Sequence, residues 1–453
     1  MSNKLPSKVY WAYGFQEFAM GFMTTMGVQY FSYFLTDVAF VAPAIVATIL
    51  LVGRIVDTVD VPIIGVLVEK SNLPWGKYRS WLFITPPLIM LFNVLMFTNM
   101  DISMTIKPII LAACYILSYV FVNFASTARL SLLPTFTNDQ NERAILSAKR
   151  GQGAALGQIV RGAIVVPLVS LLGAGNEARG YQLTVALFGL MTILGLYYLA
   201  YLAKDYDKPG VTTGKQTVSV RDMIASVATN KPLLLLLLAD TTRLAAGNIL
   251  TGLGMYFFRY VVGDLALWSV YLPASFVGGF LGNTVSQYIS VSTDKKTTYR
   301  LGILVWFAGM LSVFLFAGSN PALFIAFVAI AQFGNGLCNA GVSAFYSDTA
   351  DYGEWKTGKS VRAVNMGLTI FPIKLGLTIG GSIASFGLVF IGFEAGTTNP
   401  AVISGIRAMI GILPAVVSLL SLVFMTLYPL TRERMNTIQE ELRQRKSAAP
   451  ETV

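Results

Sequence analysis

Two aspartates lie three residues apart inside a long apolar stretch of this chain. Asp57 and Asp60 fall within residues 42–69. Residues three apart share one face of a helix, and two carboxylates on one face can hold a hard cation through oxygen ligands. The pair could instead carry a proton, or Asp57 could form a structural ion pair with Arg54 one turn away. Of these readings we favour the two in which the acids bind Na⁺ or H⁺.

Further charged residues lie in other apolar stretches. They are Glu17, Arg129, Arg161, Asp240, Arg243 and Lys374. A charge inside a bilayer costs at least ~2.5–3.5 kcal/mol on insertion scales, so each should face a partner or a wet cavity. With the second-span residues included, the interior holds five cations against four anions. Because guanidinium groups bind carboxylate, phosphate or sulfate in bidentate geometry, the surplus favours an anionic solute; alternatively, Arg243 only neutralises Asp240.

The elements that must position these groups are membrane spans. Hydrophobic residues make up 55% and charged residues 12% of the 453 positions, whereas soluble domains are about 25% charged. About 20 apolar residues cross the hydrocarbon as a helix, because lipid offers the backbone no other hydrogen-bond partner. Twelve spans are predicted, near residues 10–36, 42–69, 81–99, 107–133, 151–174, 181–203, 232–262, 265–289, 300–317, 321–349, 361–392 and 402–429. We therefore predict an all-α membrane protein.

Residue types on which enzymes and metal sites depend are scarce. Histidine is absent, which excludes His-based metal sites and Ser–His or Cys–His catalysis. Cys114 and Cys338 lie far apart in apolar stretches and are expected to be packing residues. We predict no enzyme activity, no cofactor, and no metal other than a coupling Na⁺ at Asp57 and Asp60.

Basic residues cluster in alternate gaps between the predicted spans. Lys77 and Arg79 fall in one such gap and Lys149 and Arg150 in another, whereas the gap around Asp101 holds few. This alternation follows the positive-inside rule and places both termini in the cytoplasm. The net charge of +10 is therefore explained by the orientation of the chain in the membrane. We expect a multi-pass protein of the inner (cytoplasmic) membrane that contacts lipids, acts as a monomer and binds no nucleic acid.

A polar segment divides the spans into two sets of six. Residues 204–231 are rich in Lys, Thr, Asp and Gly, which is typical of a cytoplasmic linker. The linker joins predicted six-helix bundles at 1–203 and 232–430, and a charged cytoplasmic tail follows at 431–453. Basic loops recur at matching places in both halves. This predicts the major facilitator architecture, in which two bundles rock around a site at the bilayer midplane.

Several motifs together resemble one transporter family. GRIVDTVDVPIIG stands at 53–65, PWGKYR at 74–79 and SDTADYGEWK at 347–356, with YGF at 13–15 and TDV at 36–38. Taken together they resemble the glycoside–pentoside–hexuronide:cation symporter family almost end to end. The resemblance implies uptake of a sugar-like solute driven by Na⁺, H⁺ or Li⁺.

The resemblance also implies a cation site. In the family the ion lies on acids of the second helix, aided by a polar residue of the fourth. Asp57 occupies the first acid position, the second falls on Val61 with Asp60 one residue earlier, and the fourth-helix position falls on Asn123. The implied ligands are Asp57, Asp60 and Asn123.

The solute site departs further from the family pattern. The sugar-binding acid of the first helix falls on Gly21, where Glu17, one turn earlier, could substitute, and the fourth-helix acid falls on Ser126. The family's basic positions are kept as Arg150 and Lys374. Together with the interior charges, the predicted solute-binding residues are Glu17, Gly21, Ser126, Arg129, Arg150, Arg161, Asp240, Arg243 and Lys374.

We predict a cation-coupled secondary symporter that imports a glycoside-like small-molecule solute, with a uronide or other acid group, by alternating access. Asp348, Asp351 and Glu354 are predicted to form gating charge pairs between the two halves. One alternative is a carrier of an amphipathic lipid-like or steroid-like solute. Another is a transporter-like sensor that does not translocate.

Overall fold

The computed structural model describes residues 5–137, 139–207, 226–358 and 362–448, and every regular element in these ranges is a helix. Most of the predicted linker (208–225) and the two ends of the chain (1–4 and 449–453) lie outside the described residues.

The first part of the chain forms six long helical segments. They are α1 (Ser7–Thr25), which runs on through η1 (Met26–Tyr30), α2 (Phe31–Tyr33) and η2 (Phe34–Val38), then α3 (Pro43–Lys70), α4 (Arg79–Met96), α5 (Lys107–Phe136), α6 (Gln140–Gly173) and α7 (Glu177–Leu202) with η3 (Ala203–Asp205). The turns η1 and η2 are π-helical, a form often found where a helix departs from regular packing at functional sites.

The second part supplies six more segments and a tail helix. They are α9 (Lys231–Tyr256) with η4 (Phe257–Val262), η5 (Leu265–Leu267) with α10 (Trp268–Ser292), α11 (Lys295–Ser312) with η6 (Val313–Ala317), α12 (Pro321–Thr357), α13 (Arg362–Gly367) with α14 (Ile370–Phe390), α15 (Pro400–Leu427) and α16 (Arg432–Ala448). These twelve segments fall on the twelve predicted spans, and α16 falls in the predicted tail.

Ten of the described segments are long and apolar enough to cross a membrane. The other two predicted spans correspond to α1 with its π-helical turns and to α3. Helix α3 carries Arg54, Asp57 and Asp60 in its middle, so any stretch of it long enough to span includes all three charges. The two segments that are not apolar enough to be counted as spans therefore both carry candidate site residues.

Contacts divide the chain into two compact units. Unit 1 comprises Met1–Gly214, Gly254–Pro273 and Ala384–Ile403, and unit 2 comprises Lys215–Leu253, Ala274–Ile383 and Ser404–Val453. The six-helix bundles predicted at 1–203 and 232–430 stay a prediction.

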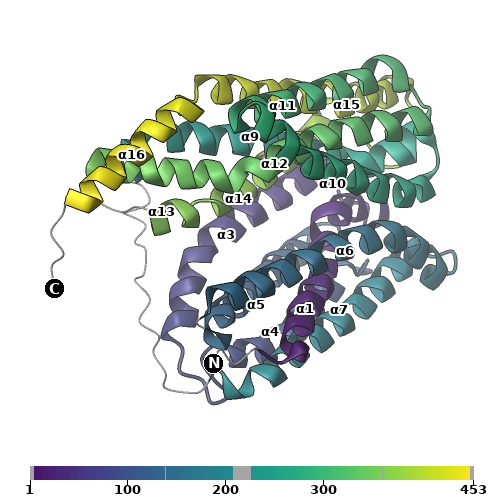
Figure 1. Ribbon diagram of the computed structural model, residues 1–453. Coiled ribbons are helices and arrows are strands. Elements are labelled where there is room, and N and C mark those ends of the chain that lie inside the picture. The colour runs from purple at the N-terminus through teal and green to yellow at the C-terminus, as the bar shows by residue number, and fades with distance from the viewer. Residues whose placement is uncertain (1–4, 138, 208–225, 359–361, 449–453) are drawn as a thin grey trace. The chain divides into compact units, whose positions relative to one another are not determined.

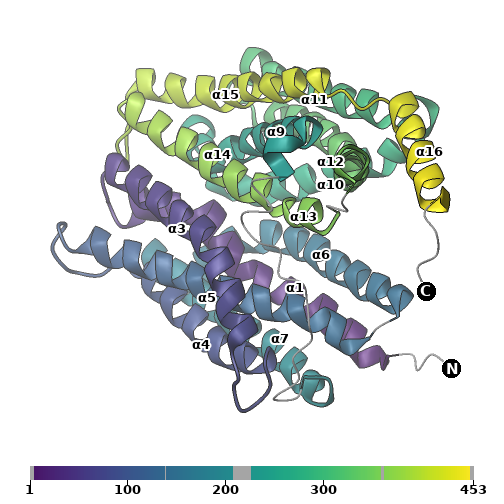
Figure 2. The same ribbon diagram turned by 90° about the vertical axis from the view of Figure 1, so that its left-hand side faces the viewer.

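In unit 1, α1 packs against α6 and α7, α4 against α5 and α7, and α3 against α5 (Figures 1 and 2). Small residues allow the close approaches. A Cβ on Gly153 of α6 would lie 2.0 Å from the carbonyl oxygen of Gly14 in α1, so only glycine allows these two backbones to meet.

Unit 1 also includes the ends of α9 and α10, which are tied to the first span by hydrogen bonds. The hydroxyl of Tyr256 lies 3.0 Å from Thr36 Oγ1, and Trp268 Nε1 donates to Tyr30 Oη at 3.1 Å. The hydroxyl of Tyr260 donates to Asp37. Three of the four π-helical turns, η1, η2 and η4, lie in this contact region.

The PWGKYR loop is held by a carboxylate from the far end of α7. Asp207 Oδ2 accepts from the backbone N–H of Tyr78 at 2.8 Å and of Arg79 at 2.6 Å, which caps the N-terminus of α4. Gly76 has φ +122°, and a Cβ there would lie 2.5 Å from the Asp207 carbonyl oxygen. The glycine of this motif is thus required by the backbone conformation and by the close approach of residue 207.

In unit 2, α11 lies along α12, and the tail helix α16 packs on α12. Met435, Ile438 and Leu442 of α16 join a buried cluster that includes Phe345 and Tyr346 of α12. The tail therefore forms part of the core of unit 2, a role that its alternating charge did not predict.

The packing of α3 on α5 generates a stability prediction. A Cβ on Gly53 would lie 2.2 Å from the ring of Tyr115, whereas a Cβ on Gly65 of the same helix would meet nothing within 4 Å. The Tyr115 ring is buried and stacks on Phe31 at 4.9 Å between centroids, so it has little room to move. Gly53→Ala is expected to destabilise by about 1–3 kcal/mol through overpacking.

Gly65→Ala is the matched control, because it should be neutral or slightly stabilising through helix propensity. The measurement is the thermal unfolding midpoint of the purified protein in detergent. Equal midpoints for the two variants would contradict this packing.

Candidate functional site

The predicted cation ligands meet inside unit 1, between α3 and α5. Asn123 Nδ2 donates to Asp57 Oδ1 and to Asp60 Oδ1, both at 2.8 Å, and it approaches the Asp57 carbonyl oxygen at 3.4 Å. Asp57 is 3% and Asn123 7% exposed. Rotation of the amide by 180° would present its oxygen in place of its nitrogen. Three side chains and one backbone carbonyl could then offer oxygen ligands to a small hard cation.

The alternative ion pair of Arg54 with Asp57 exists but is long. Arg54 Nη1 lies 3.9 Å from Asp57 Oδ2. The guanidinium lies over two aromatic rings instead, 4.7 Å from the centroid of Tyr119 and 5.6 Å from that of Tyr115. Aromatic faces stabilise a desolvated cation by about 2 kcal/mol. Arg54 is therefore supported by α5 as well as by Asp57.

A second charged cluster joins α1, α5 and α6. Glu17 accepts a hydrogen bond from Arg129 Nη1 and lies 4.0 Å from Arg150 Nε. Arg129 also donates to Gln16 Oε1 at 3.0 Å. Glu17 thus stands between two cations, and its role as a substitute for the family's first-helix acid stays a prediction.

The space in front of Gly21 is filled by a guanidinium. A Cβ on Gly21 would lie 2.2 Å from Arg161 Nη1, and a Cβ on Gly157 would lie 2.3 Å from the same atom. Arg161 is 4% exposed and donates to the carbonyl oxygen of Phe18 at 3.2 Å. The guanidinium of Arg161 therefore occupies the space that a side chain at position 21 would need.

The positive charge of the Arg161 guanidinium has few partners. Its guanidinium lies 5.4 Å from the ring centroid of Phe22, and its Nε has no hydrogen-bond partner. Within the part of the chain that the structure describes, no carboxylate forms an ion pair with it. A buried guanidinium in this state is suited to an incoming anion.

Helix α5 carries both kinds of site residue. Asn123, Ser126 and Arg129 follow at intervals of three residues, so they share one face of the helix. Ser126 is half-buried. The candidate cation ligand Asn123 and the candidate solute residue Ser126 thus lie on the same helix.

The other predicted solute residues belong to unit 2. Arg243 donates through Nε to Asp240 Oδ1 at 3.0 Å, through Nη2 to the same oxygen, and through Nη1 to Asn335. Asp240 and Arg243 are both buried, so this pair neutralises itself within α9. Lys374 lies on α14 and is half-buried. No position relative to unit 1 is assigned to these residues.

The predicted gating acids lie near the C-terminal end of α12. Asp348 forms an ion pair with Lys295 at the start of α11, and Asp351 accepts from Gln439 of α16 at 3.4 Å. Glu354 accepts the backbone N–H of Gly358 through its carbonyl, which ends the helix. Pairing of these acids with the other half stays a prediction.

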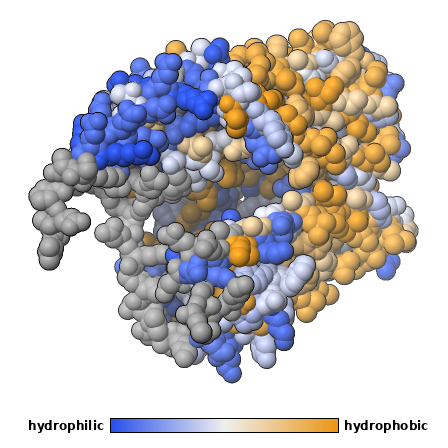
Figure 3. Space-filling model, viewed as in Figure 1, coloured by the Kyte–Doolittle hydropathy of each residue, from blue (hydrophilic) through white to orange (hydrophobic). Residues whose placement is uncertain are grey.

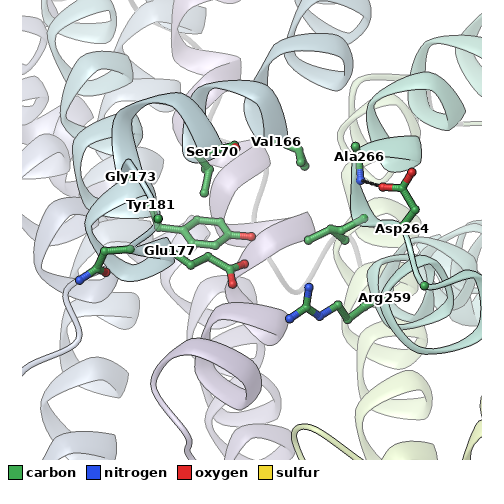
Figure 4. A pocket seen from close by; sticks show the side chains of 13 residues that line it. Val166, Ser170, Gly173, Glu177, Tyr181, Arg259, Asp264 and Ala266 are labelled. Carbon is green, nitrogen blue, oxygen red and sulfur yellow. Dashed lines mark hydrogen bonds between the residues drawn. The ribbon is translucent and has the colours of Figure 1, made fainter.

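A separate cavity of about 390 Å³ lies at the other end of unit 1, where α6 meets α7 (Figure 4). Figure 4 shows the Arg259 guanidinium directed toward Glu177, with the Tyr181 hydroxyl beside them. Arg259 was missing from the predicted interior charges because it lies at the edge of a predicted span, where a basic residue is ordinary.

Other polar partners were also missed. Gln16 and Asn335, which bind Arg129 and Arg243, are neutral residues inside apolar stretches. Their rarity in such stretches was an available signal, but only helix packing shows which charge each one meets.

The chain is similar to known proteins along most of its length. The family described as MFS/sugar transport protein matches residues 12–432. The chain is 28% identical to the inner membrane symporter YicJ of Escherichia coli K12, over 96% of this chain and 94% of that protein. It is also 28% identical to the glucuronide carrier protein homolog of Escherichia coli K12, over 100% and 99% of the two chains.

A solved structure resembles the whole chain. The bacterial homolog of the human lysosomal transporter Spinster, in an inward-facing and unoccupied conformation, matches with a TM-score of 0.66 and 14% identity, over 96% of this chain and 97% of that one. The likeness confirms the predicted all-α major facilitator fold.

The Glu17 cluster generates a double-mutant prediction. Glu17→Gln leaves the guanidinium of Arg129, whose side chain is 11% exposed, without its carboxylate. Breaking a buried pair in this way is expected to cost about 3 kcal/mol. The double variant Glu17→Gln/Arg129→Gln should be more stable than Glu17→Gln, because it leaves no lone charge.

Arg150→Gln is the control. The Arg150 side chain is 37% exposed, so its ion pair with Glu17 should contribute under about 1 kcal/mol to stability. Thermal unfolding in detergent compares wild type with Glu17→Gln, Arg129→Gln, the double variant and Arg150→Gln, so that the double variant is judged against both single variants. Additive effects in the double variant would argue against a buried pair.

Proposed function

The chain belongs to the MFS/sugar transport protein family, and from that premise we propose that it is a cation-coupled symporter that imports an acid-bearing glycoside. It is a multi-pass membrane transporter and not an enzyme. The coupling cation, the anionic solute and the cytoplasmic position of both termini are parts of the proposal.

One observation carries the coupling role, namely the convergence of Asp57 and Asp60 on the amide of Asn123. Two carboxylates that share a donor repel each other, and a bound Na⁺ or proton relieves that repulsion. Arg54 stacks on tyrosine rings and its Nη1 lies 3.9 Å from Asp57 Oδ2, so the proposed ion site is the side of the two carboxylates that faces Asn123. Cation binding at this point would bias how α3 and α5 pack, and so bias alternating access.

Arg161 supports the choice of an anionic solute. It lies buried against Gly21, the position at which a sugar-binding acid is expected, with Nε lacking an acceptor. A carboxylate offers the charge-assisted hydrogen bonds that this guanidinium lacks, whereas a neutral hydroxyl offers weaker ones. One relative named above is a glucuronide carrier protein homolog, and a uronide combines a sugar ring with such a carboxylate.

Uptake in proteoliposomes under an imposed Na⁺ or pH gradient tests the coupling role. Wild-type protein should accumulate a glucuronide above equilibrium under one of the two gradients. Asp57→Asn should lose gradient-driven accumulation and retain exchange of internal for external solute, because only the ion ligand is removed.

Asp101→Asn is the matched control, since Asp101 is exposed between α4 and α5 and removal of its charge should change nothing. Full accumulation by Asp57→Asn would contradict the coupling role.

A second assay compares Arg161→Gln with wild type on a glucuronide and on a neutral galactoside. Loss of a charge-assisted contact of about 1.5–3 kcal/mol predicts at least a ten-fold fall in glucuronide uptake at low concentration, with a smaller effect on the galactoside. Gly21→Ala should act in the same direction, because its Cβ would displace the guanidinium.

Arg179→Gln serves as the control, because Arg179 is exposed near the start of α7. Equal transport of both sugars by wild type, with no competition from anions, would show that the solute is not acidic.

A further inference from the structure

A cavity of about 510 Å³ lies in unit 2, and none of its lining residues is among those predicted to bind solute or cation. It is enclosed by the end of α10, the start of α11 and the tail helix α16. Its lining includes the basic residues Lys295, Lys296 and Arg432 and the hydrogen-bonding residues Ser290 and Asn436. The cavity therefore combines cations with neutral donors.

The acids in this cavity are already engaged. Asp294 caps α11 by accepting from Thr297 N at 2.7 Å and Thr297 Oγ1 at 2.9 Å. Burial alone would raise the pKa of Asp294, but these hydrogen bonds hold the pKa below its ordinary value. Asp348 is bound to Lys295. Asp294 keeps its negative charge and also interacts electrostatically with Lys296. The lining therefore holds three cations, Lys295, Lys296 and Arg432, against the two anions Asp294 and Asp348, and one positive charge is left over.

Lys296 and Arg432 have no ion-pair partner within the described ranges. Lys296 Nζ donates to the carbonyl oxygens of Tyr428 at 2.6 Å and Thr426 at 3.2 Å, which fixes the ammonium at the end of α15. Arg432 is exposed. Both residues line the same cavity, with the Lys296 ammonium held by backbone carbonyls and the Arg432 side chain exposed.

An apolar surface begins next to these charges. Helices α11 and α15 are joined by the hydrogen bond between Tyr299 Oη and Ser421 Oγ, and both present exposed large side chains. They are Leu301 and Leu304 on α11 and Leu420, Val423 and Leu427 on α15, each between 41% and 60% exposed. In Figure 3 the hydrophilic surface over α16 gives way to a hydrophobic surface over these helices.

We propose that the cavity binds the phosphate headgroup of an anionic phospholipid, with its acyl chains along α11 and α15. Lys296 and Arg432 would hold the phosphate, and Ser290 and Asn436 would donate hydrogen bonds to the headgroup. Basic pockets beside apolar helix surfaces at a membrane face are suited to such lipids. The site lies at the face where the basic loops are found, which the positive-inside rule assigns to the cytoplasm.

The test uses the purified full chain in a neutral detergent and follows its thermal unfolding midpoint as lipid is added. Phosphatidylglycerol is expected to raise the midpoint in a saturable way, and phosphatidylcholine with the same acyl chains is expected to have little effect. Arg432→Gln should weaken the apparent affinity for phosphatidylglycerol about five-fold, from the loss of one charge near the headgroup.

Arg443→Gln is the matched control, because Arg443 is an exposed arginine of the same helix that does not line the cavity. It should bind phosphatidylglycerol as wild type does. Equal stabilisation by phosphatidylcholine, or equal weakening in the two variants, would overturn the proposal. Equal stabilisation by inorganic phosphate alone would show that the site takes free phosphate, and would overturn the lipid as its ligand.

Discussion

Hydrocarbon offers no partner to a polar group, so each charge inside a membrane span must find its partner within the protein. This constraint organises the interior of both units. Arg129 binds Glu17 and Gln16, and Arg243 binds Asp240 and Asn335. The proposed function depends on the buried charged groups that have the fewest partners within the protein.

Two such places lie in unit 1, and helix α5 contributes to the first of them. At one, Asn123 binds both aspartates of α3; three and six residues further along the same face stand Ser126 and Arg129. At the other, Arg161 of α6 lies against Gly21 of α1. In the proposed mechanism, a cation that changes the packing of α3 on α5 acts on the helix that also carries Ser126 and Arg129. This helix is the proposed route of linkage between ion and solute.

The spans were predictable because the hydrocarbon thickness sets a length and a composition that the sequence must satisfy. The bounds of α3 and α5 follow from apolar runs, and the motif at 53–65 marks the acids. The contact between Gly21 and Arg161 could not be predicted, because the two residues are far apart in sequence and meet only when the helices pack. The tail showed the same limit: its charges masked the apolar face of α16 that packs on α12.

The central claim is that the carboxylates of α3 bind an ion whose occupancy is coupled to that of the solute. The most direct test is equilibrium binding of a glucuronide to the purified protein at a series of Na⁺ concentrations and pH values. Reciprocal linkage predicts that the apparent Kd for the glucuronide falls as Na⁺ or proton activity rises. A Kd that stays constant across both series would contradict the account.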